Sequence, residues 1–282
     1  MNDFIISSDE TCDLPITYCK ENRIPILPVY YYMENTLYGK DKIQSLSAFY
    51  KKMRNNVHPT TVAPNIEDTK NFFNDLIKSS PDIIHIAFSG ALSSTCQNAL
   101  IAANEIMDCE PDVRIKVIDS LCSSLGEGLL IYKAQEYAKN HTFEEVTEYI
   151  EETKRKIAHI FTVDDLSYLQ QGGRISRGTK IIGNLINIKP ILHVNGEGEL
   201  KMIDKVRGRK KAISYLFDKF ITESNENNST IMISHCDCID DVNTLKKMIL
   251  EKTTVKKIIV NQISPCIGAH SGPGTLAIFY EK

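Results

Sequence analysis

A histidine among glycines near the end of the chain is the first candidate for chemistry. Residues 266–275 read CIGAHSGPGT and place His270 beside small residues, which let a backbone approach a ligand closely. An imidazole at such a position can donate a hydrogen bond to an oxyanion. The segment lies between two apolar runs, so we expect a tight loop between strands. A single loop histidine is usually incidental, and its role depends on which side chains the fold brings to it.

Two serines form a second candidate. Ser93 and Ser94 follow the apolar run at residues 83–88 and precede a helical pattern. We therefore expect them at the carboxyl end of a sheet strand, where open α/β sheets bind ligands. The positive end of the helix dipole there favours an anion such as a carboxylate or a phosphate. Serines at such junctions also cap the helix, and the two roles are compatible.

A threonine and an arginine are weaker candidates. Thr61 belongs to a hydroxyl pair that precedes a helical pattern, which a capping turn also explains. Arg174 lies in a double-glycine turn, GGRIS, and could hold an anion, pair with an acid or stay solvated. Neither segment identifies a site without the other candidates.

The cysteines do not form a recognisable metal or disulfide framework. Eight cysteines are scattered along 282 residues, and the acidic N-terminal segment does not resemble an export signal, so we expect reduced thiols. The one dense cluster, His235-Cys236-Asp237-Cys238, lacks the second ligand pair usual for zinc. A strand that ends in polar residues also explains residues 235–238. We therefore predict no metal and no cofactor.

Charge and hydropathy limit the possible partners. The formal net charge is -3, which gives no general attraction to nucleic acid or to an anionic membrane surface. No apolar run approaches the roughly 18 residues needed to cross a bilayer. We therefore expect a cytoplasmic protein that neither binds nucleic acid nor inserts stably into a membrane.

The elements that must position these residues alternate between strand and helix. In the first half, apolar runs predict strands at 4–7, 24–29, 83–88 and 115–119, and periodicity predicts helices at 46–53, 66–77, 93–107, 125–138 and 143–156. Thr142 and Glu145 fit a capping box at the start of the last of these helices. Apolar strands that alternate with helices imply a parallel sheet with both faces covered.

The second half predicts a different sheet. Strands are expected at 157–163, 190–194, 201–206, 230–234, 256–263 and 275–279, with helices at 165–170, 207–222 and 242–250. The turn at 195–198 joins two of the strands as a hairpin, so this sheet is mixed. We predict an α/β protein of two domains, a Rossmann-like parallel-sheet domain at 1–156 and a mixed-sheet domain at 157–282.

Seven segments, taken in order, resemble the DegV family, the bacterial fatty-acid-binding proteins that serve as the lipid-carrying subunit of fatty acid kinase. They are Asp9 with residues 13–15, Thr61 with Pro64, and residues 92–97, 117–120, 168–176, 188–192 and 268–274. The resemblance implies a long-chain fatty acid, such as palmitate or oleate, in a buried tunnel between the two domains. It also implies that a separate kinase catalytic subunit is the partner.

The resemblance also assigns roles to the candidates. Thr61 and Ser93 match residues that hydrogen-bond the fatty acid carboxylate, and His270 completes that cluster. Ser94 replaces the family's glycine and adds a possible donor. Arg174 matches an arginine that supports the loop over the head group or meets the kinase.

The chain departs from the family's pattern in two places. Val62 and Ala63 stand where a serine and a glutamine are usual in the family. The side-chain hydrogen bonds that the family forms around this threonine therefore do not carry over to Thr61 from the resemblance. Glu10 replaces a small hydroxyl residue.

Two other functions stay open. Ser93 as nucleophile and His270 as base would make a serine hydrolase or acyltransferase, although the pattern G-x-S-x-G and a marked third acid are absent. The start of the helix after Ser93 and the basic residues 207–211 could instead form a phosphate-ligand or regulator-binding module. No P-loop or dinucleotide fingerprint is present, so we expect a carrier without catalytic residues of its own.

Overall fold

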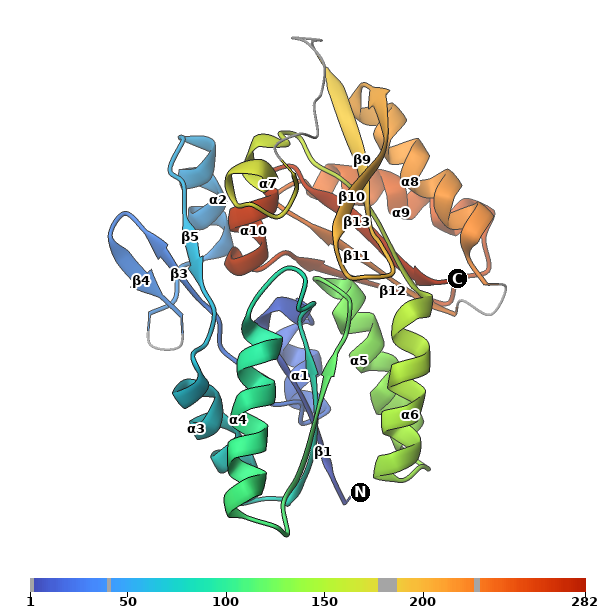
Figure 1. Ribbon diagram of the computed structural model, residues 1–282. Coiled ribbons are helices and arrows are strands. Elements are labelled where there is room, and N and C mark those ends of the chain that lie inside the picture. Colours follow the sequence, from blue (N-terminus) through green and yellow to red (C-terminus); the bar gives the residue numbers. More distant parts are fainter. Residues whose placement is uncertain (1–2, 40–41, 177–186, 226–228) are drawn as a thin grey trace.

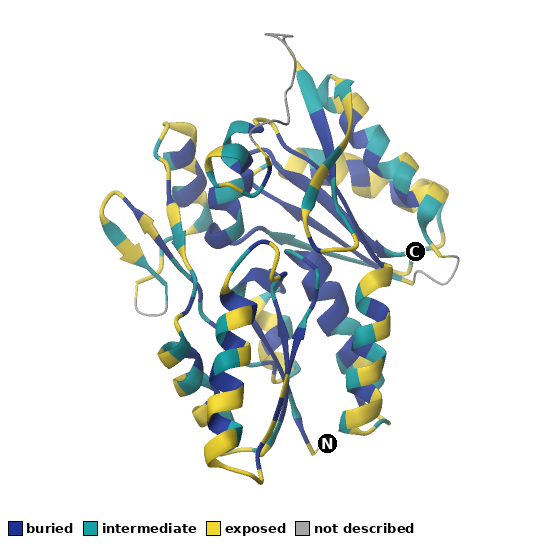
Figure 2. Cartoon of the chain, in the orientation of Figure 1, coloured by how far each residue is buried: buried dark blue, intermediate teal, exposed yellow. Residues whose placement is uncertain are grey.

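The computed structural model describes residues 3–39, 42–176, 187–225 and 229–282. Within these ranges the chain forms a four-stranded sheet, a six-stranded sheet and a small three-stranded sheet (Figure 1). Helices cover the two large sheets, with buried inner faces and exposed outer faces (Figure 2). The two-domain α/β fold predicted from the sequence is confirmed.

The N-terminal sheet is parallel, in the order β2 (Ile26–Leu27), β1 (Ile5–Asp9), β6 (Asp82–Ala87) and β7 (Arg114–Asp119). Successive residues of these strands point to opposite faces. One face packs against α3 (Ile66–Ile77) and α4 (Thr95–Cys109). The other face packs against α1 (Ile16–Glu21), α5 (Leu125–Ala138) and α6 (Phe143–Thr153).

The small sheet was not predicted. Its order is β4 (Thr36–Tyr38), β3 (Tyr30–Met33) and β5 (Thr60–Val62), all antiparallel. The strand expected at 24–29 is shortened to Ile26–Leu27, since Pro28 has no N–H for the ladder. Thr61 pairs with Tyr31 in a strand instead of lying in a capping turn.

This sheet and α2 (Leu46–Arg54) pack on the C-terminal half of the chain. Their buried side chains form one cluster with those of Cys236, Ile263, Cys266 and Ala269. Along the chain, the first strand of the six-stranded sheet begins at Ile157. The boundary after residue 156 stays a prediction, because residues 29–33 and 49–53 pack with the second half of the chain.

The six-stranded sheet has the order β10 (Leu200–Arg207), β9 (Ile188–Val194), β8 (Ile157–Thr162), β13 (Leu276–Glu281), β11 (Thr230–His235) and β12 (Lys257–Gln262). Only β11 and β12 are parallel to each other, so the sheet is mixed as expected. Helices α8 (Arg209–Glu223) and α9 (Ile239–Lys252) cover one face. The other face turns Phe161, Ala277 and Phe279 toward the N-terminal domain.

The loop expected around His270 is mostly a helix. Residues Pro265–Ser271 form α10, which lies beside α7 (Ser167–Gln171) (Figure 1). Proline suits the first helical turn because it has no N–H to satisfy there. The helix ends at Gly272, whose φ of 80° favours glycine. His270 is therefore held on a helix rather than on a flexible turn.

Candidate functional site

A cavity of about 240 Å³ lies where the two domains meet. In the same measure, one water molecule needs only about 10–15 Å³, so the cavity has room for a much larger ligand. Its walls come from the inner face of the mixed sheet, from α10 and from the starts of α4 and α5. The apolar part includes Leu92, Phe161, Leu169, Leu200 and Phe279.

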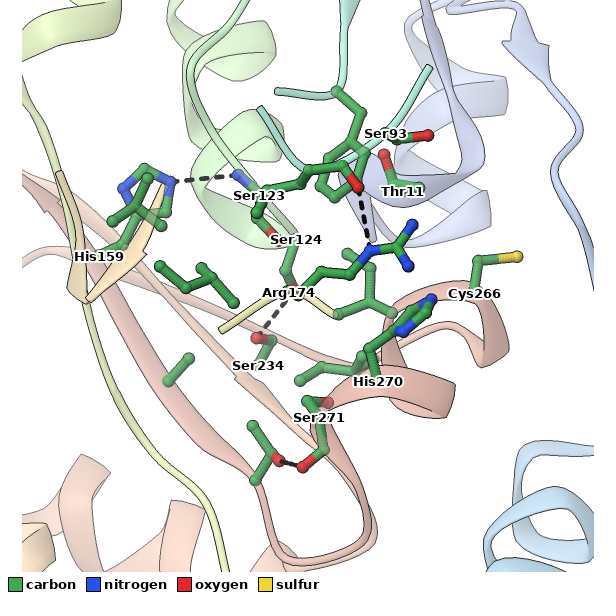
Figure 3. Close-up of a pocket in the computed structure, with 18 of the residues that line it drawn as sticks. Thr11, Ser93, Ser123, Ser124, His159, Arg174, Ser234, Cys266, His270 and Ser271 are labelled. Atoms are coloured by element: carbon green, nitrogen blue, oxygen red, sulfur yellow. Dashed lines mark hydrogen bonds between the residues drawn. The ribbon is translucent and has the colours of Figure 1, made fainter. Parts of the chain in front are cut away.

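All five candidates from the sequence line this one cavity: Thr61, Ser93, Ser94, Arg174 and His270. Figure 3 shows the Arg174 guanidinium between Ser93 and His270. These side chains come from strand β5, the start of α4, the turn after α7, and α10. The fold thus gathers them at one polar region beside apolar walls.

Thr61 and His270 form a direct pair. The Oγ1 of Thr61 lies 2.8 Å from the Nε2 of His270. The Nδ1 of His270 is buried without a hydrogen-bond partner among the described residues, and it faces Gly172, where a Cβ would lie 2.2 Å away. Burial, helped by the positive charge of Arg174, lowers the pKa of His270 to about 4. The imidazole is therefore neutral at pH 7.

Ser93 lies just before the N-cap of α4 and also lines the cavity. Its Oγ accepts a hydrogen bond from the backbone N–H of Thr95 at 3.2 Å and lies 2.9 Å from the Thr95 hydroxyl. Ser94 is exposed and makes no side-chain cap bond, so its hydroxyl stays available at the edge of the cavity. The expected helix start at residue 93 is thus two residues early.

Arg174 is a part-buried cation that no acid neutralises in the described chain. Its Nε donates to the carbonyl of Leu92 at 3.1 Å, and its Nη1 donates to the carbonyl of Gly172. Burial lowers the pKa of the guanidinium. A cation that is held by two carbonyls beside a cavity attracts an anionic ligand.

Sequence reasoning missed a set of buried acids behind the cavity wall. The hydroxyl of Thr11, which lines the cavity, lies 3.0 Å from Glu127 Oε2 and also within hydrogen-bond distance of Asp9 Oδ1, so its one hydrogen serves only one of these acids. Ser8 Oγ lies 2.7 Å from the carbonyl of Ile86 and 2.8 Å from Glu127 Oε1. The Ser8 hydroxyl has one hydrogen for two acceptors. Burial and the charge of Asp9 raise the pKa of Glu127 well above its ordinary value, so a protonated Glu127 supplies the other hydrogen.

A third buried acid connects the two domains. Asp13 accepts from the Ser124 hydroxyl and, at 2.8 Å, from the N–H of Ser264 just before α10. Ser234 Oγ of strand β11 lies 3.0 Å from Ser124 Oγ. Burial raises the pKa of Asp13 to about 7, although both of its serine partners oppose the shift. Only the motif position of Asp13 could have signalled this network from the sequence.

The cluster at His235 closes the end of its strand. His235 Nδ1 accepts from the N–H of Cys238, whose sulfur donates to the carbonyl of Thr275 at 3.2 Å. Among the described residues, no group of His, Cys, Asp and Glu side chains is arranged to hold a metal ion. The same residues include no helix with the length and hydropathy of a membrane span.

Fold and cavity together define a two-domain α/β protein with a cavity between its domains. The chain belongs to the DegV family: the family model described as "Uncharacterised protein, DegV family" matches residues 4–282. A DegV domain-containing protein of Clostridium perfringens is 40% identical over 99% of this chain and 98% of its own length.

Solved structures share the whole fold. The structure described as fatty acid binding of a DegV family protein from Thermus thermophilus is 27% identical, with a TM-score of 0.89 over 100% of both chains. The fatty acid kinase B3 protein of Streptococcus pneumoniae, loaded with linoleic acid, has a TM-score of 0.86. The match covers 100% of this chain and 99% of the Streptococcus pneumoniae protein. The two sequences are only 22% identical, so this likeness shows a shared fold alone.

Proposed function

We propose that this protein binds one long-chain fatty acid, of the palmitate or oleate class, in the cavity between its domains. The observation that carries the proposal is the guanidinium of Arg174, which pairs with no acid among the described residues and lies beside hydroxyl groups at the edge of an otherwise mainly apolar cavity. A ligand that fits needs one negative charge and a long apolar body. The fatty acid binding of the Thermus thermophilus relative supports this choice.

The carboxylate would lie among Thr61, Ser93, Ser94 and Arg174. For Thr61 to donate to a carboxylate, its oxygen must accept the hydrogen on His270 Nε2, and a neutral imidazole can place its single hydrogen there. His270 then orients the Thr61 hydroxyl. Hydrogen bonds to a charged group contribute about 1.5–3 kcal/mol each, so several donors can replace the water that the carboxylate loses.

The acyl chain would supply most of the affinity. Each buried methylene contributes about 0.8 kcal/mol, and Phe161, Leu169 and Phe279 offer apolar wall along the cavity. The polar end sets the orientation of the ligand.

We further propose that the bound carboxylate is presented to a separate fatty acid kinase, in the cytoplasm, and is phosphorylated there. The exposed Ser94 places the polar end near the surface, where a partner can reach it. The sequence motifs shared with the family support the kinase as partner. No residue of this chain then needs to act as a catalyst.

The two alternatives have less support. Ser93 pairs with Thr95 and His270 with Thr61, so the nucleophile and the base of the hydrolase hypothesis are not hydrogen-bonded to each other. Of the basic start of α8, Arg209 is already paired with Asp241 at 2.8 Å. A fluorophosphonate probe should therefore leave Ser93 unlabelled, and labelling that Ser93→Ala abolishes would restore the hydrolase.

Lipid extraction with mass spectrometry tests the proposal directly. The purified protein should release a long-chain fatty acid, and the delipidated protein should rebind oleate or palmitate. Incubation with the kinase and ATP, followed by hydroxylamine trapping, should yield an acyl hydroxamate. A lipid-free preparation that refuses both fatty acids would overturn the binding proposal, and binding without trapping would overturn the kinase step alone.

A further inference from the structure

A serine interrupts the apolar inner face of the mixed sheet. Ser234 lies on β11, and it is followed across the sheet by Ala277 of β13 and Phe161 of β8 in one row of paired residues. All three line the fatty acid cavity. Ser234 is fully buried, and the neighbouring Ala277 offers only a methyl group beside it. A buried hydroxyl in an apolar wall is unfavourable unless hydrogen bonds satisfy it.

The Ser234 hydroxyl has one hydrogen-bond partner in the described chain, the hydroxyl of Ser124 at 3.0 Å. Ser124 also lies within hydrogen-bond distance of Asp13 Oδ2, so it has one hydrogen for two neighbours. When that hydrogen goes to Asp13, Ser234 donates to Ser124 and keeps both of its lone pairs. When it goes to Ser234, the hydrogen of Ser234 itself has no acceptor. In both arrangements, Ser234 can form a further hydrogen bond with a ligand.

The residues behind Ser234 hold it in one position. Asp13 accepts from the N–H of Ser264 at 2.8 Å, and the carbonyl of Asp13 accepts from Asn261 Nδ2 at 2.8 Å. Asp13 and Ser124 are both buried and have positive φ angles of 51° and 54°. Such angles are unfavourable for a residue with a side chain, and they occur where the surrounding structure enforces them, often at functional sites.

Ser234 lies away from the proposed head-group site. Figure 3 shows its hydroxyl apart from the Arg174 guanidinium and from the His270 imidazole. A carboxylate held by Arg174 therefore does not also contact Ser234. The part of the ligand that meets Ser234 belongs to the acyl chain.

We propose that Ser234 and Ser124 form a second polar contact of the cavity, and that the preferred ligand is a long-chain fatty acid with a hydroxyl group on its chain. A hydroxyl fits because it can donate to Ser234 in one arrangement and accept from it in the other. A keto oxygen can only accept. Palmitate and oleate would still bind through the head group and the apolar wall, but without this contact. The inference rests on the proposed function, since it requires a fatty acid in the cavity.

Binding of matched ligands to the full-length protein tests the proposal. The ligands are stearate and two sets of its derivatives, which carry a hydroxyl or a methyl group near the head, the middle or the end of the chain. A methyl group is similar in size to a hydroxyl and forms no hydrogen bond, so each pair separates chemistry from shape. At the position that meets Ser234, the hydroxyl derivative should bind more tightly than its methyl counterpart. Displacement of a fluorescent lipid probe measures both dissociation constants.

Removal of the Ser234 hydroxyl should reverse this preference. In Ser234→Ala, the ratio of the two dissociation constants should shift by roughly tenfold toward the methyl derivative, because the buried ligand hydroxyl loses its partner. A purely structural role of Ser234 would weaken both ligands alike and leave the ratio unchanged. Ser271→Ala is the matched control, since Ser271 is another buried serine of the cavity wall, and its hydroxyl lies 3.4 Å from the sulfur of Cys236. This variant should keep the wild-type ratio.

Two results would overturn the inference. One is a wild type that binds the methyl derivative at least as tightly as the hydroxyl derivative at every chain position. The other is a hydroxyl preference that survives in Ser234→Ala. If circular dichroism shows that Ser234→Ala does not fold, Ser234→Cys takes its place, because a thiol hydrogen-bonds only weakly. A wild type that binds none of these fatty acids would refute the proposed function, whereas stearate binding without a hydroxyl preference would refute this inference alone.

Discussion

The hydroxyl of Thr61 and the imidazole of His270 meet at 2.8 Å, although 209 residues separate them in the chain. Thr61 lies on the small sheet, and His270 lies on the helix that packs against it. The proposed head-group site therefore exists only when the first and last parts of the fold are assembled together.

Removal of the Thr61 hydroxyl should weaken fatty acid binding. Thr61→Val keeps the shape of the strand but loses a hydrogen bond to the carboxylate, and a charge-assisted bond is worth about 1.5–3 kcal/mol, or roughly 10- to 100-fold in the dissociation constant. Fluorescence displacement of a bound lipid probe measures the change. Thr60→Val is the matched control, since Thr60 is the exposed neighbour on the same strand.

His270 should act through Thr61 and not independently of it. His270→Phe alone should weaken oleate binding, because the Thr61 hydroxyl loses its orientation. The double variant with Thr61→Val should bind no worse than Thr61→Val by itself. Additive losses in this cycle would instead mean that His270 contacts the ligand directly.

Arg174 should recognise the charge of the ligand and not its chain. Arg174→Gln should weaken the binding of palmitate by roughly 10-fold or more, since a charged partner of the carboxylate is lost. The binding of 1-hexadecanol, which has the same chain length and no charge, should hardly change. Calorimetric titration of both ligands decides the matter, and equal losses would show that Arg174 only supports the loop.

Asp13 should make stability depend on pH. Its folded pKa of about 7 lies above the ordinary aspartate pKa of about 3.9, so the folded state binds the proton more tightly than the unfolded state. The resulting stabilisation is full below about pH 4 and is lost as the pH rises to about 7. Relative to Asp13→Asn, the wild type should lose on the order of 4 kcal/mol of unfolding free energy over this range. Urea unfolding at several pH values measures it, and parallel profiles would contradict the shift.

The tip of the β9–β10 hairpin should hold the cavity closed. Ser89 Oγ donates to the carbonyl of Gly198 at 2.9 Å. Gly198 has a φ of 79°, and a Cβ added to it would lie 2.2 Å from the Oγ of Ser89. Gly198→Ala should destabilise the protein by about 1–3 kcal/mol and accelerate oleate dissociation. Stopped-flow release and thermal unfolding measure both effects. Gly196→Ala, in open space on the same turn, should behave as wild type.

Local pattern was enough for most of the elements. The helices Ile66–Ile77 and Leu125–Ala138 have the predicted bounds, and the capping box of Thr142 and Glu145 is present. Periodicity and capping report the burial and hydrogen bonding of neighbouring residues, which is why short segments suffice. The resemblance in motif order likewise indicated the family and the residues that line the cavity.

The tertiary structure alone decided how those residues meet. The strand character of Thr60–Val62 depends on pairing with Tyr30–Met33, which no local pattern records. The buried networks of Asp9, Asp13 and Glu127 depend on partners up to 251 residues away, so their raised pKa values have no local signal. The sequence by itself determined the elements and the family, because these depend on near neighbours and motif order. Desolvation and hydrogen bonding between distant segments determined the site, and these forces act only once the chain is folded.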